Sequence, residues 1–437
     1  MLLPTLVLSD NSLMHDNATF FLILCSAMVL FMTPGLAFFY GGLVRVSSVV
    51  SMMMMSFGSI ALVGTLWVAF GYAMSFGGAR SSGFYGIDGF FGIDLNKLFL
   101  ADVFNAAKTG SGFDLVFAGF QGTFAIITVA LISGAIADRA RFGSWMIFAA
   151  LWAILAYFPI AGWVFNFTLD NGKIVDGGWL VKDVGLLDFA GGTAVEVASG
   201  AGALAVALVV GRRFGFSKGM YVPHNVPLTL IGAGILWFGW FGFNAGSELA
   251  ADGVATLAFV NTLVAPVGGL ISWSIYDRLR HGKPTAVGAA SGAIAGLVAI
   301  TPSCAFLTPL WALALGALVG VVCAFAVELK WVLGFDDSLD VVGIHLVGGI
   351  VGTLFIGLVG NNVGLIFTGS FDQLGKQAIG VLVVGLWAFA ASWLIAFAIQ
   401  KTIGFRVKST DEIAGVDLVL HGESAYSEQD PRWRWTP

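Results

Sequence analysis

Charged side chains are scarce in this chain. Only 11% of its 437 residues are Asp, Glu, Lys or Arg, whereas an average soluble domain carries roughly 25%. Hydrophobic residues make up 58% of the chain, and its mean hydropathy is +0.90. The sequence therefore excludes a soluble globular protein and predicts a polytopic protein whose surroundings are the lipid bilayer.

Residues that carry catalytic or metal chemistry are also few. The three cysteines, Cys25, Cys304 and Cys323, lie in or beside apolar segments and show neither disulfide nor metal-ligand spacing. We find no nucleophile paired with a base and no phosphate-cradling loop. We therefore expect a protein that is not an enzyme and that has no metal site, no cofactor and no nucleic-acid partner.

Long apolar runs dominate what is present. Runs of about 20 residues can span a bilayer as helices, and the abundant glycine (59 residues) lets such helices pack closely. We therefore expect an all-α membrane protein with eleven transmembrane helices. The predicted spans lie near residues 19–44, 49–76, 115–137, 143–166, 190–210, 226–246, 253–276, 285–301, 306–329, 340–360 and 377–401.

The basic residues predict the orientation of these spans. Alternate loops, together with the C-terminal residues, hold 15 Lys and Arg, and the other set of loops holds 6. Cytoplasmic loops carry an excess of Lys and Arg, so we expect the N-terminus outside and the C-terminus inside. Residues 1–401 are predicted to form the transmembrane domain, and residues 402–437 a charged cytoplasmic tail.

One ionisable residue, Glu196, lies at the centre of the fifth predicted span. A charge at that depth costs about 2.5–3.5 kcal/mol, so such residues usually face a cavity or a partner. Asp188 begins the same span, eight residues earlier. We expect it to act as a helix N-cap, because its carboxylate can accept hydrogen bonds from free backbone amides.

A faint internal repeat gives Glu196 a partner. The segment from Glu196 to Gly200 matches the segment from His345 to Gly349 in the tenth span: one ionisable residue, then apolar and small ones. Spans five apart run antiparallel, as in a five-plus-five inverted repeat, whose site lies near the membrane midplane. Glu196 and His345 could relay protons, stabilise a small cation or only satisfy each other, and the residues leave these alternatives open.

Aromatic residues gather near the predicted outer ends of other spans. Phe120 and Phe124 are four residues apart and share a helix face. Trp240 and Phe243 precede Ser247. Aromatic faces attract cations by roughly 0.5–2 kcal/mol, and stacked rings can close a narrow pore.

Several motifs together resemble those of the ammonium transporter family (Amt/MEP/Rh). They are Asp188-Phe-Ala-Gly-Gly, Phe120-Gln-Gly-Thr-Phe-Ala, Pro223-His-Asn, Gly239-Trp-Phe-Gly-Phe-Asn-Ala-Gly-Ser, Asp340-Val-Val-Gly-Ile-His and His421-Gly-Glu-Ser-Ala-Tyr. The resemblance implies eleven spans in an inverted repeat, and a homotrimer with one pore in each subunit.

The resemblance also implies roles for single residues. In substrate binding, Phe120 and Ser247 would line an external recruitment site for the ammonium ion, and Asp188 would support it. Below that site, Phe124 and Phe243 would form the gate. The remaining implied positions are His345 as the second of the paired pore histidines, and Gln121 and Trp240 as neighbours of the gate.

The chain departs from the family pattern at two places. The tryptophan of the recruitment site is replaced by Phe165, which offers a π-face but no indole N–H; Trp163 lies two residues earlier and could compensate. Glu196 takes the place of the first pore histidine, as in some fungal members. Its negative charge is expected to favour cations and to loosen discrimination against potassium.

The expected function is ammonium or ammonia transport across the plasma (inner) membrane. The ion would be recruited outside and deprotonated; ammonia would cross the apolar pore, while Glu196 and His345 carry the proton. A PII-type signalling protein could act on the tail. The alternative is an ammonium sensor that binds the ion with little flux. A sodium-coupled amino-acid transporter is disfavoured, because Pro34, Pro159 and Pro266 are not repeat-related.

Overall fold

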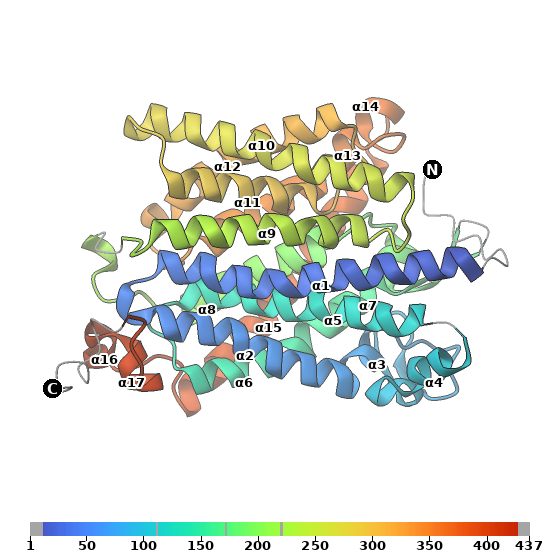
Figure 1. Cartoon of the computed structure of the whole chain (residues 1–437), viewed down its shortest axis with the longest axis horizontal. Coiled ribbons are helices and arrows are strands. Elements are labelled where there is room, and N and C mark those ends of the chain that lie inside the picture. The colour runs from blue at the N-terminus through green and yellow to red at the C-terminus, as the bar shows by residue number, and fades with distance from the viewer. Residues whose placement is uncertain (1–11, 111, 171–172, 219–221, 427–437) are drawn as a thin grey trace.

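The computed structural model describes residues 12–110, 112–170, 173–218 and 222–426. Its helices lie side by side along the long axis of the molecule (Figure 1). Long apolar runs favour such helices. The bilayer core offers no water for hydrogen bonding, and a helix pairs its backbone N–H and C=O groups internally. The five longest are α1 (Ser12–Leu43), α15 (Asp372–Thr402), α10 (Gly253–His281), α12 (Pro309–Leu333) and α9 (Val226–Gly246).

Within the described ranges, ten helical stretches are long and apolar enough to cross a membrane. They correspond to ten of the eleven predicted spans. The eighth predicted span, residues 285–301, forms α11 (Ala286–Ile300), which has 15 residues. It is about 22 Å long, short of the roughly 30 Å hydrocarbon core. Pro302 follows and disfavours continued helix, so the eleventh crossing stays a prediction.

Several spans are not uniform α-helices. Four contain a π-helical turn, and α5 (Phe113–Ile132) ends in the 3-10 turn Ser133–Ile136. The π turns are Trp67–Gly71 between α2 (Val49–Leu66) and α3 (Tyr72–Ser75), Ala153–Tyr157 between α6 (Phe142–Trp152) and α7 (Phe158–Phe165), Gly192–Val197 before α8 (Ala198–Val210), and Val342–Leu346 before α13 (Val347–Val359).

Glycine allows close approach between helices of the bundle. A Cβ added to Gly269 of α10 would lie 2.2 Å from the Gly292 carbonyl oxygen of α11. A Cβ added to Gly292 would lie 2.5 Å from the Gly269 carbonyl oxygen. Both distances are far below van der Waals contact, so this crossing requires glycine on both helices.

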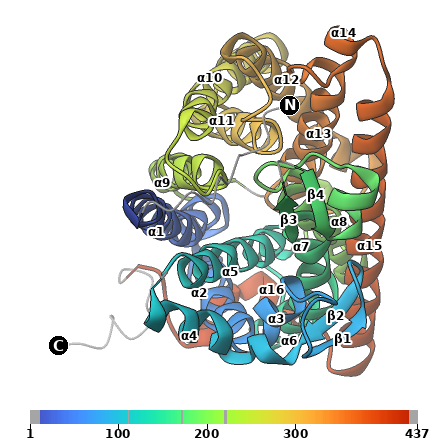
Figure 2. The same ribbon diagram turned by 90° about the vertical axis from the view of Figure 1, so that its right-hand side faces the viewer.

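The end of the bundle that faces the viewer in Figure 2 carries short elements. Residues 77–114 connect the second and third predicted spans, and the structure forms a hairpin there. Gly89 has a φ of +69°, which permits the three-residue turn between β1 and β2. The elements at this end are β1 (Phe84–Ile87), β2 (Phe91–Asp94), the 3-10 turns Leu95–Leu100, α4 (Ala101–Thr109), β3 (Phe167–Asp170), β4 (Lys173–Gly177), the π turn Leu180–Val184 and α14 (Leu365–Thr368).

The opposite end, which we call the tail end, carries α16 (Ser409–Ala414) and α17 (Val416–His421) (Figure 1). The 3-10 turns Val46–Ser48 and Phe216–Lys218 also belong to it. The Asp417 carboxylate accepts hydrogen bonds from the backbone N–H groups of Val50 (3.0 Å) and Ser51 (2.8 Å). The tail is therefore docked on the first turn of α2.

Candidate functional site

Four phenylalanines form a cluster between α5, α7 and α9. The Phe124 and Phe243 rings are stacked, with centroids 4.1 Å apart and planes inclined by 23°. Phe120 meets Phe124 edge-on at 4.8 Å, and Phe165 meets it at 6.3 Å. Phe124 and Phe243 are both 1% exposed, so the stacked pair blocks the direct path between their helices.

Ser247 and Asp188 flank this cluster from different segments. Ser247 follows α9, is half-buried, and donates a hydrogen bond to the Phe243 carbonyl oxygen (2.8 Å). The Asp188 carboxylate accepts hydrogen bonds from four successive backbone N–H groups and the Thr193 hydroxyl. With its oxygens thus engaged, Asp188 shapes the chain beside the cluster, as an N-cap does.

Trp163 is not brought to this cluster. Its indole N–H donates to the Phe90 carbonyl oxygen at 2.5 Å, and its ring stacks on Phe90 at 5.5 Å. It also packs against Trp179 and Trp387. The expectation that Trp163 compensates for Phe165 lacks structural support, because its N–H and its ring faces are already used by the β1–β2 hairpin and its neighbours.

Glu196 and His345 meet in the middle of the bundle. His345 Nδ1 lies 2.6 Å from Glu196 Oε2, and the two residues are 4% and 1% exposed. This is the contact that the internal repeat predicts. The separation is that of a strong charge-assisted hydrogen bond, so the pair can hold one proton between its two groups.

A narrow cavity lies beside this pair. Its volume is about 10 Å³, which is roughly room for one water molecule. Phe243 and Trp240 line one part of it, and Glu196 and His345 line another. The other lining residues are apolar: Met32, Leu36, Phe39, Ile127, Leu131, Val195, Leu236 and Ile294. A neutral molecule fits such a lining better than a bare ion does.

The backbone around the pair has a geometry that the sequence did not reveal. Glu196 and His345 both lie in π-helical turns, a form that is rare and frequent at functional sites. A Cβ added to Gly349 would lie 2.9 Å from Glu196 Cβ, and one added to Gly200 would lie 2.6 Å from Leu346 Cα. Each of the two glycines that the repeat relates thus lies in the helix after one π turn and packs against the other π turn.

A second aspartate extends the repeat and was missed by the sequence analysis. Asp337 precedes His345 by eight residues, as Asp188 precedes Glu196. The Asp337 carboxylate accepts a hydrogen bond from the Val342 N–H (2.7 Å) at the start of its π turn. The equal spacing could have identified this residue in the sequence.

Two further predicted neighbours of the gate are buried. The Trp240 indole donates to the hydroxyl of Thr301 (2.8 Å), which holds the ring beside Phe243 at 5.7 Å. Gln121 is 7% exposed, and its side-chain oxygen has no hydrogen-bond partner among the described residues. Thr301 carried no signal in the sequence; a buried indole N–H needs a partner, but only the fold shows which residue supplies it.

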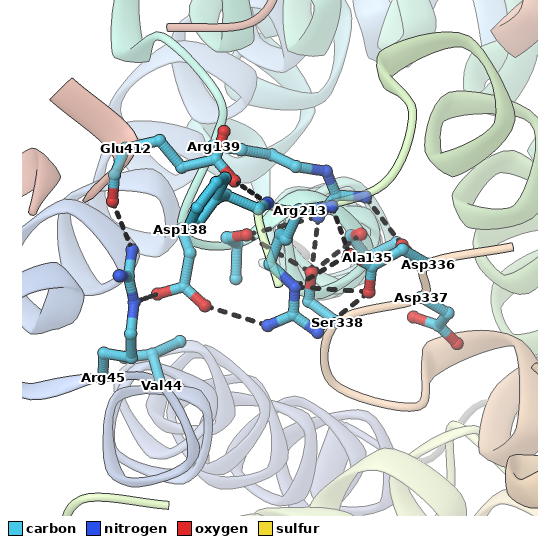
Figure 3. Close-up of polar contacts among 12 residues, drawn as sticks. Val44, Arg45, Ala135, Asp138, Arg139, Arg213, Asp336, Asp337, Ser338 and Glu412 are labelled. Carbon is cyan, nitrogen blue, oxygen red and sulfur yellow. Dashed lines mark hydrogen bonds and ion pairs between the residues drawn. The ribbon is translucent and has the colours of Figure 1, made fainter. Parts of the chain in front are cut away.

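A buried polar network, which we call the tail-end network, joins four loops (Figure 3). Arg213 pairs with Asp138 and Asp336, each at 2.9 Å. Arg139 donates to the Ser338 hydroxyl and the Asp336 carbonyl oxygen, both at 2.6 Å. Burial alone would raise the pKa of Asp336, but hydrogen bonds from Arg213 and the charge of Arg139 outweigh burial and lower it.

The tail joins this network through Glu412. The Glu412 carboxylate accepts from Arg406 (2.7 Å) and from the Phe214 backbone N–H (2.6 Å). The Glu412 carbonyl oxygen accepts from Arg45 (2.8 Å), whose guanidinium lies 3.7 Å from Asp138. Figure 3 shows Arg45 between Glu412 and Asp138. The tail is thus connected to the loops that follow three different spans.

Comparison with known proteins gives the same family throughout. Residues 20–426 match the model of the Ammonium Transporter Family. A Mycobacterium bovis ammonium transporter is 46% identical over 430 residues, which cover 93% of this chain and 90% of the relative. Candida albicans Mep2 superposes with a TM-score of 0.81 at 33% identity, covering 96% of this chain and 93% of that one.

A structure described as a sensor Amt protein superposes with a TM-score of 0.84 at 28% identity, covering 94% of this chain and 99% of that one. The solved structures therefore include a relative described as a sensor. The family model spans nearly the whole chain, and the stacked phenylalanines and the buried polar pair lie within the matched residues. The chain belongs to the ammonium transporter family and is a multi-pass membrane protein.

Proposed function

We propose that this protein takes up ammonium across the plasma membrane by separating it into ammonia and a proton. The single observation that carries the proposal is the Glu196–His345 contact beside a narrow apolar cavity behind the Phe124–Phe243 stack. A closed aromatic stack and an apolar lining oppose passage of a hydrated ion. A buried acid–base pair next to them can bind the proton separately from the ammonia.

The outer steps fall to the phenylalanine cluster. Phe120, Phe165 and Ser247 recruit the ammonium ion through aromatic faces and a hydroxyl oxygen, and Asp188 supports the site through its backbone cap. Recruitment is weaker than with an indole at the position of Phe165, because Trp163 is engaged elsewhere. Rotation of the Phe124 and Phe243 rings then admits ammonia to the cavity.

The proton travels by Glu196 and His345. Their 2.6 Å contact lets a proton move between carboxylate and imidazole without a large rearrangement. When the pair has given up its proton, Glu196 is ionised beside a neutral His345, and the pore carries a negative charge that favours cations and weakens discrimination against potassium. Because both groups of the pair can bind a proton, the ammonium current is expected to depend on pH.

The chain is oriented with its N-terminus outside and its tail, residues 402–437, in the cytoplasm. The arginines of the tail-end network support this orientation. Eleven crossings in a five-plus-five inverted repeat, supported by the reciprocal Gly200 and Gly349 contacts, complete the proposed topology. The family resemblance adds a homotrimer and a PII-type partner for the tail.

A second candidate function is ammonium sensing with little flux. The observation that favours it is the TM-score of 0.84 to the sensor Amt protein. The departures from the family pattern fit either role. Phe165 changes ion recruitment and Glu196 changes proton transfer, and the cavity is still present.

The test is a current measurement on the purified protein in liposomes. We expect an inward current after an ammonium pulse and a smaller one after a potassium pulse. Replacement of Glu196 by Ala is expected to lower the ammonium current, because His345 loses its proton partner. Replacement by His is expected to keep the current with an altered pH dependence.

Two outcomes would decide against the proposal. Ammonium binding without any current in the wild type supports the sensor. An unchanged current in the Ala variant removes the relay role of Glu196. The wild type and both variants are compared at equal protein incorporation, so that a folding defect is not read as loss of transport.

A further inference from the structure

A cavity of about 440 Å³ lies at the tail end, where α6, α15 and the tail meet. It is separate from the pore. Phe142 and Ile147 of α6, Ile403 after α15, and Leu420 of α17 give it apolar walls. Because α6 begins and α15 ends at this level, the cavity lies where the membrane-spanning bundle meets the aqueous phase.

Backbone contacts build this cavity from segments far apart in the chain. The Arg141 N–H donates to the Phe405 carbonyl oxygen, and the Val407 N–H donates to the Arg139 carbonyl oxygen, both at 2.9 Å. The Ser144 hydroxyl donates to the Gly404 carbonyl oxygen (2.7 Å). The start of the tail is thus held along the α5–α6 loop, and the cavity has a defined wall.

Two opposite charges line the cavity. The Arg141 guanidinium donates one hydrogen bond to the Ile403 carbonyl oxygen (2.9 Å) and is half-buried. Among the described residues it has no carboxylate partner within salt-bridge distance. Asp411 of α16 is also half-buried and likewise lacks a basic partner within the described part of the chain. A ligand with an anionic and a cationic group satisfies both.

An apolar row leads away from the cavity along α6 and the π turn that follows it. Ile147, Leu151 and Leu155 are 45%, 38% and 44% exposed and follow one another at intervals of four residues. Residues at this spacing lie on one side of a helix, and the row extends about 12 Å. A ligand that fits both features has a charged headgroup in the cavity and a hydrocarbon chain along the row.

We propose that this cavity is a binding site for a phospholipid with an ethanolamine headgroup. Arg141 binds the phosphate through charge-assisted hydrogen bonds, and Asp411 accepts hydrogen bonds from the primary ammonium group. The acyl chain lies along Ile147, Leu151 and Leu155. Because Asp411 and Leu420 belong to the tail, the bound lipid also holds α16 and α17 against the membrane domain.

The experiment is a lipid titration of the full-length, delipidated protein in detergent, followed by native mass spectrometry. Three lipids with identical acyl chains are compared: phosphatidylethanolamine, phosphatidylcholine and phosphatidylglycerol. The choline headgroup cannot donate a hydrogen bond to Asp411, and the glycerol headgroup has no cation. We expect the first bound ethanolamine lipid to bind about fivefold more tightly than either of the others.

The variants separate the two halves of the headgroup. Arg141→Gln is expected to weaken the ethanolamine lipid about fivefold. Asp411→Asn is expected to leave the affinity for phosphatidylcholine unchanged. It should lower the affinity for phosphatidylethanolamine to that for phosphatidylcholine. Arg212→Gln is the matched control, because Arg212 is exposed at the same end and also donates to a backbone carbonyl oxygen, that of Gly334; it should change nothing.

Equal affinities for the three lipids in the wild type would overturn the proposal, as would tighter binding of phosphatidylglycerol. An unchanged lipid affinity in Arg141→Gln would also overturn it. Asp411→Asn keeps the test decisive if Arg141→Gln fails to fold, because Asp411 makes no contact across the tail-end network. A trypsin time course gives a second readout: the ethanolamine lipid should slow cleavage after exposed Lys408 in the wild type but not in Asp411→Asn.

Discussion

Gly349→Ala tests whether the crossing of the two π turns holds the Glu196–His345 pair in place. The added methyl group would lie 2.9 Å from Glu196 Cβ and 2.9 Å from the Gly192 carbonyl oxygen. Carbon atoms in good contact are about 3.5–4.0 Å apart, so Glu196 must move by about 0.6–1.1 Å. The 2.6 Å contact with His345 would then exceed the length of a good hydrogen bond.

Two quantities should change in this variant. Overpacking costs about 1–3 kcal/mol, partly offset by the roughly 1 kcal/mol that Ala gains over Gly in a helix, so the thermal unfolding temperature should fall or stay level. The ammonium current in liposomes should fall about tenfold or more, because a shift near 1 Å is enough to disrupt a proton transfer.

Gly234→Ala is the matched control. Gly234 lies in α9, and an added Cβ would meet nothing within 4 Å. The control should keep the wild-type current and gain up to about 1 kcal/mol of stability. If Gly349→Ala behaves like Gly234→Ala in both assays, close packing at this crossing does not position the pair, and the reasoning above is refuted.

Two other perturbations test buried charges outside the spans. Burial, and after it the nearby charge of Asp252, raises the pKa of Glu248 from 4.5 to about 8. Between these pH values the folded protein retains a proton that the unfolded chain loses. Stability therefore falls as the pH rises from about 4.5 to about 8. Glu248→Gln should flatten this dependence in thermal unfolding at pH 5, 7 and 9, and a persistent slope would contradict it. Arg213→Met should destabilise the protein by about 3–5 kcal/mol, because it leaves Asp336 buried without its partner; Arg212→Met, at an exposed neighbour, should cost far less, and equal losses would contradict the role of the network.

Hydropathy was sufficient to predict the ten apolar helices that are long enough to span a membrane in the described ranges. Apolar length identifies a span whatever its neighbours are, because the bilayer imposes the same requirement on each. It does not identify where a helix changes its hydrogen-bonding pattern. The π turns around Glu196 and His345 arise where two helices cross through Gly200 and Gly349, and that crossing is a tertiary contact.

The candidate site was predictable to the extent that chemistry repeats in the sequence. Glu196 and His345 stand out as ionisable residues in apolar spans, and their contact is present in the structure. Thr301 and the position of Trp163 could not be predicted, because their partners, Trp240 of α9 and Phe90 of the β1–β2 hairpin, come from distant parts of the chain. The roles of these residues in transport stay predictions until currents are measured.

The cap that Asp417 provides for α2 has a consequence for biosynthesis. Asp417 and Ser51 are 366 residues apart in sequence. At about 5–20 residues per second, the ribosome needs roughly 20–70 s to supply the cap after α2 has emerged. During that time the backbone N–H groups of Val50 and Ser51 lack the Asp417 carboxylate as their hydrogen-bond acceptor. Completion of an early helix thus depends on a segment that is made much later, so a product truncated before Asp417 lacks the contact that completes this end of α2.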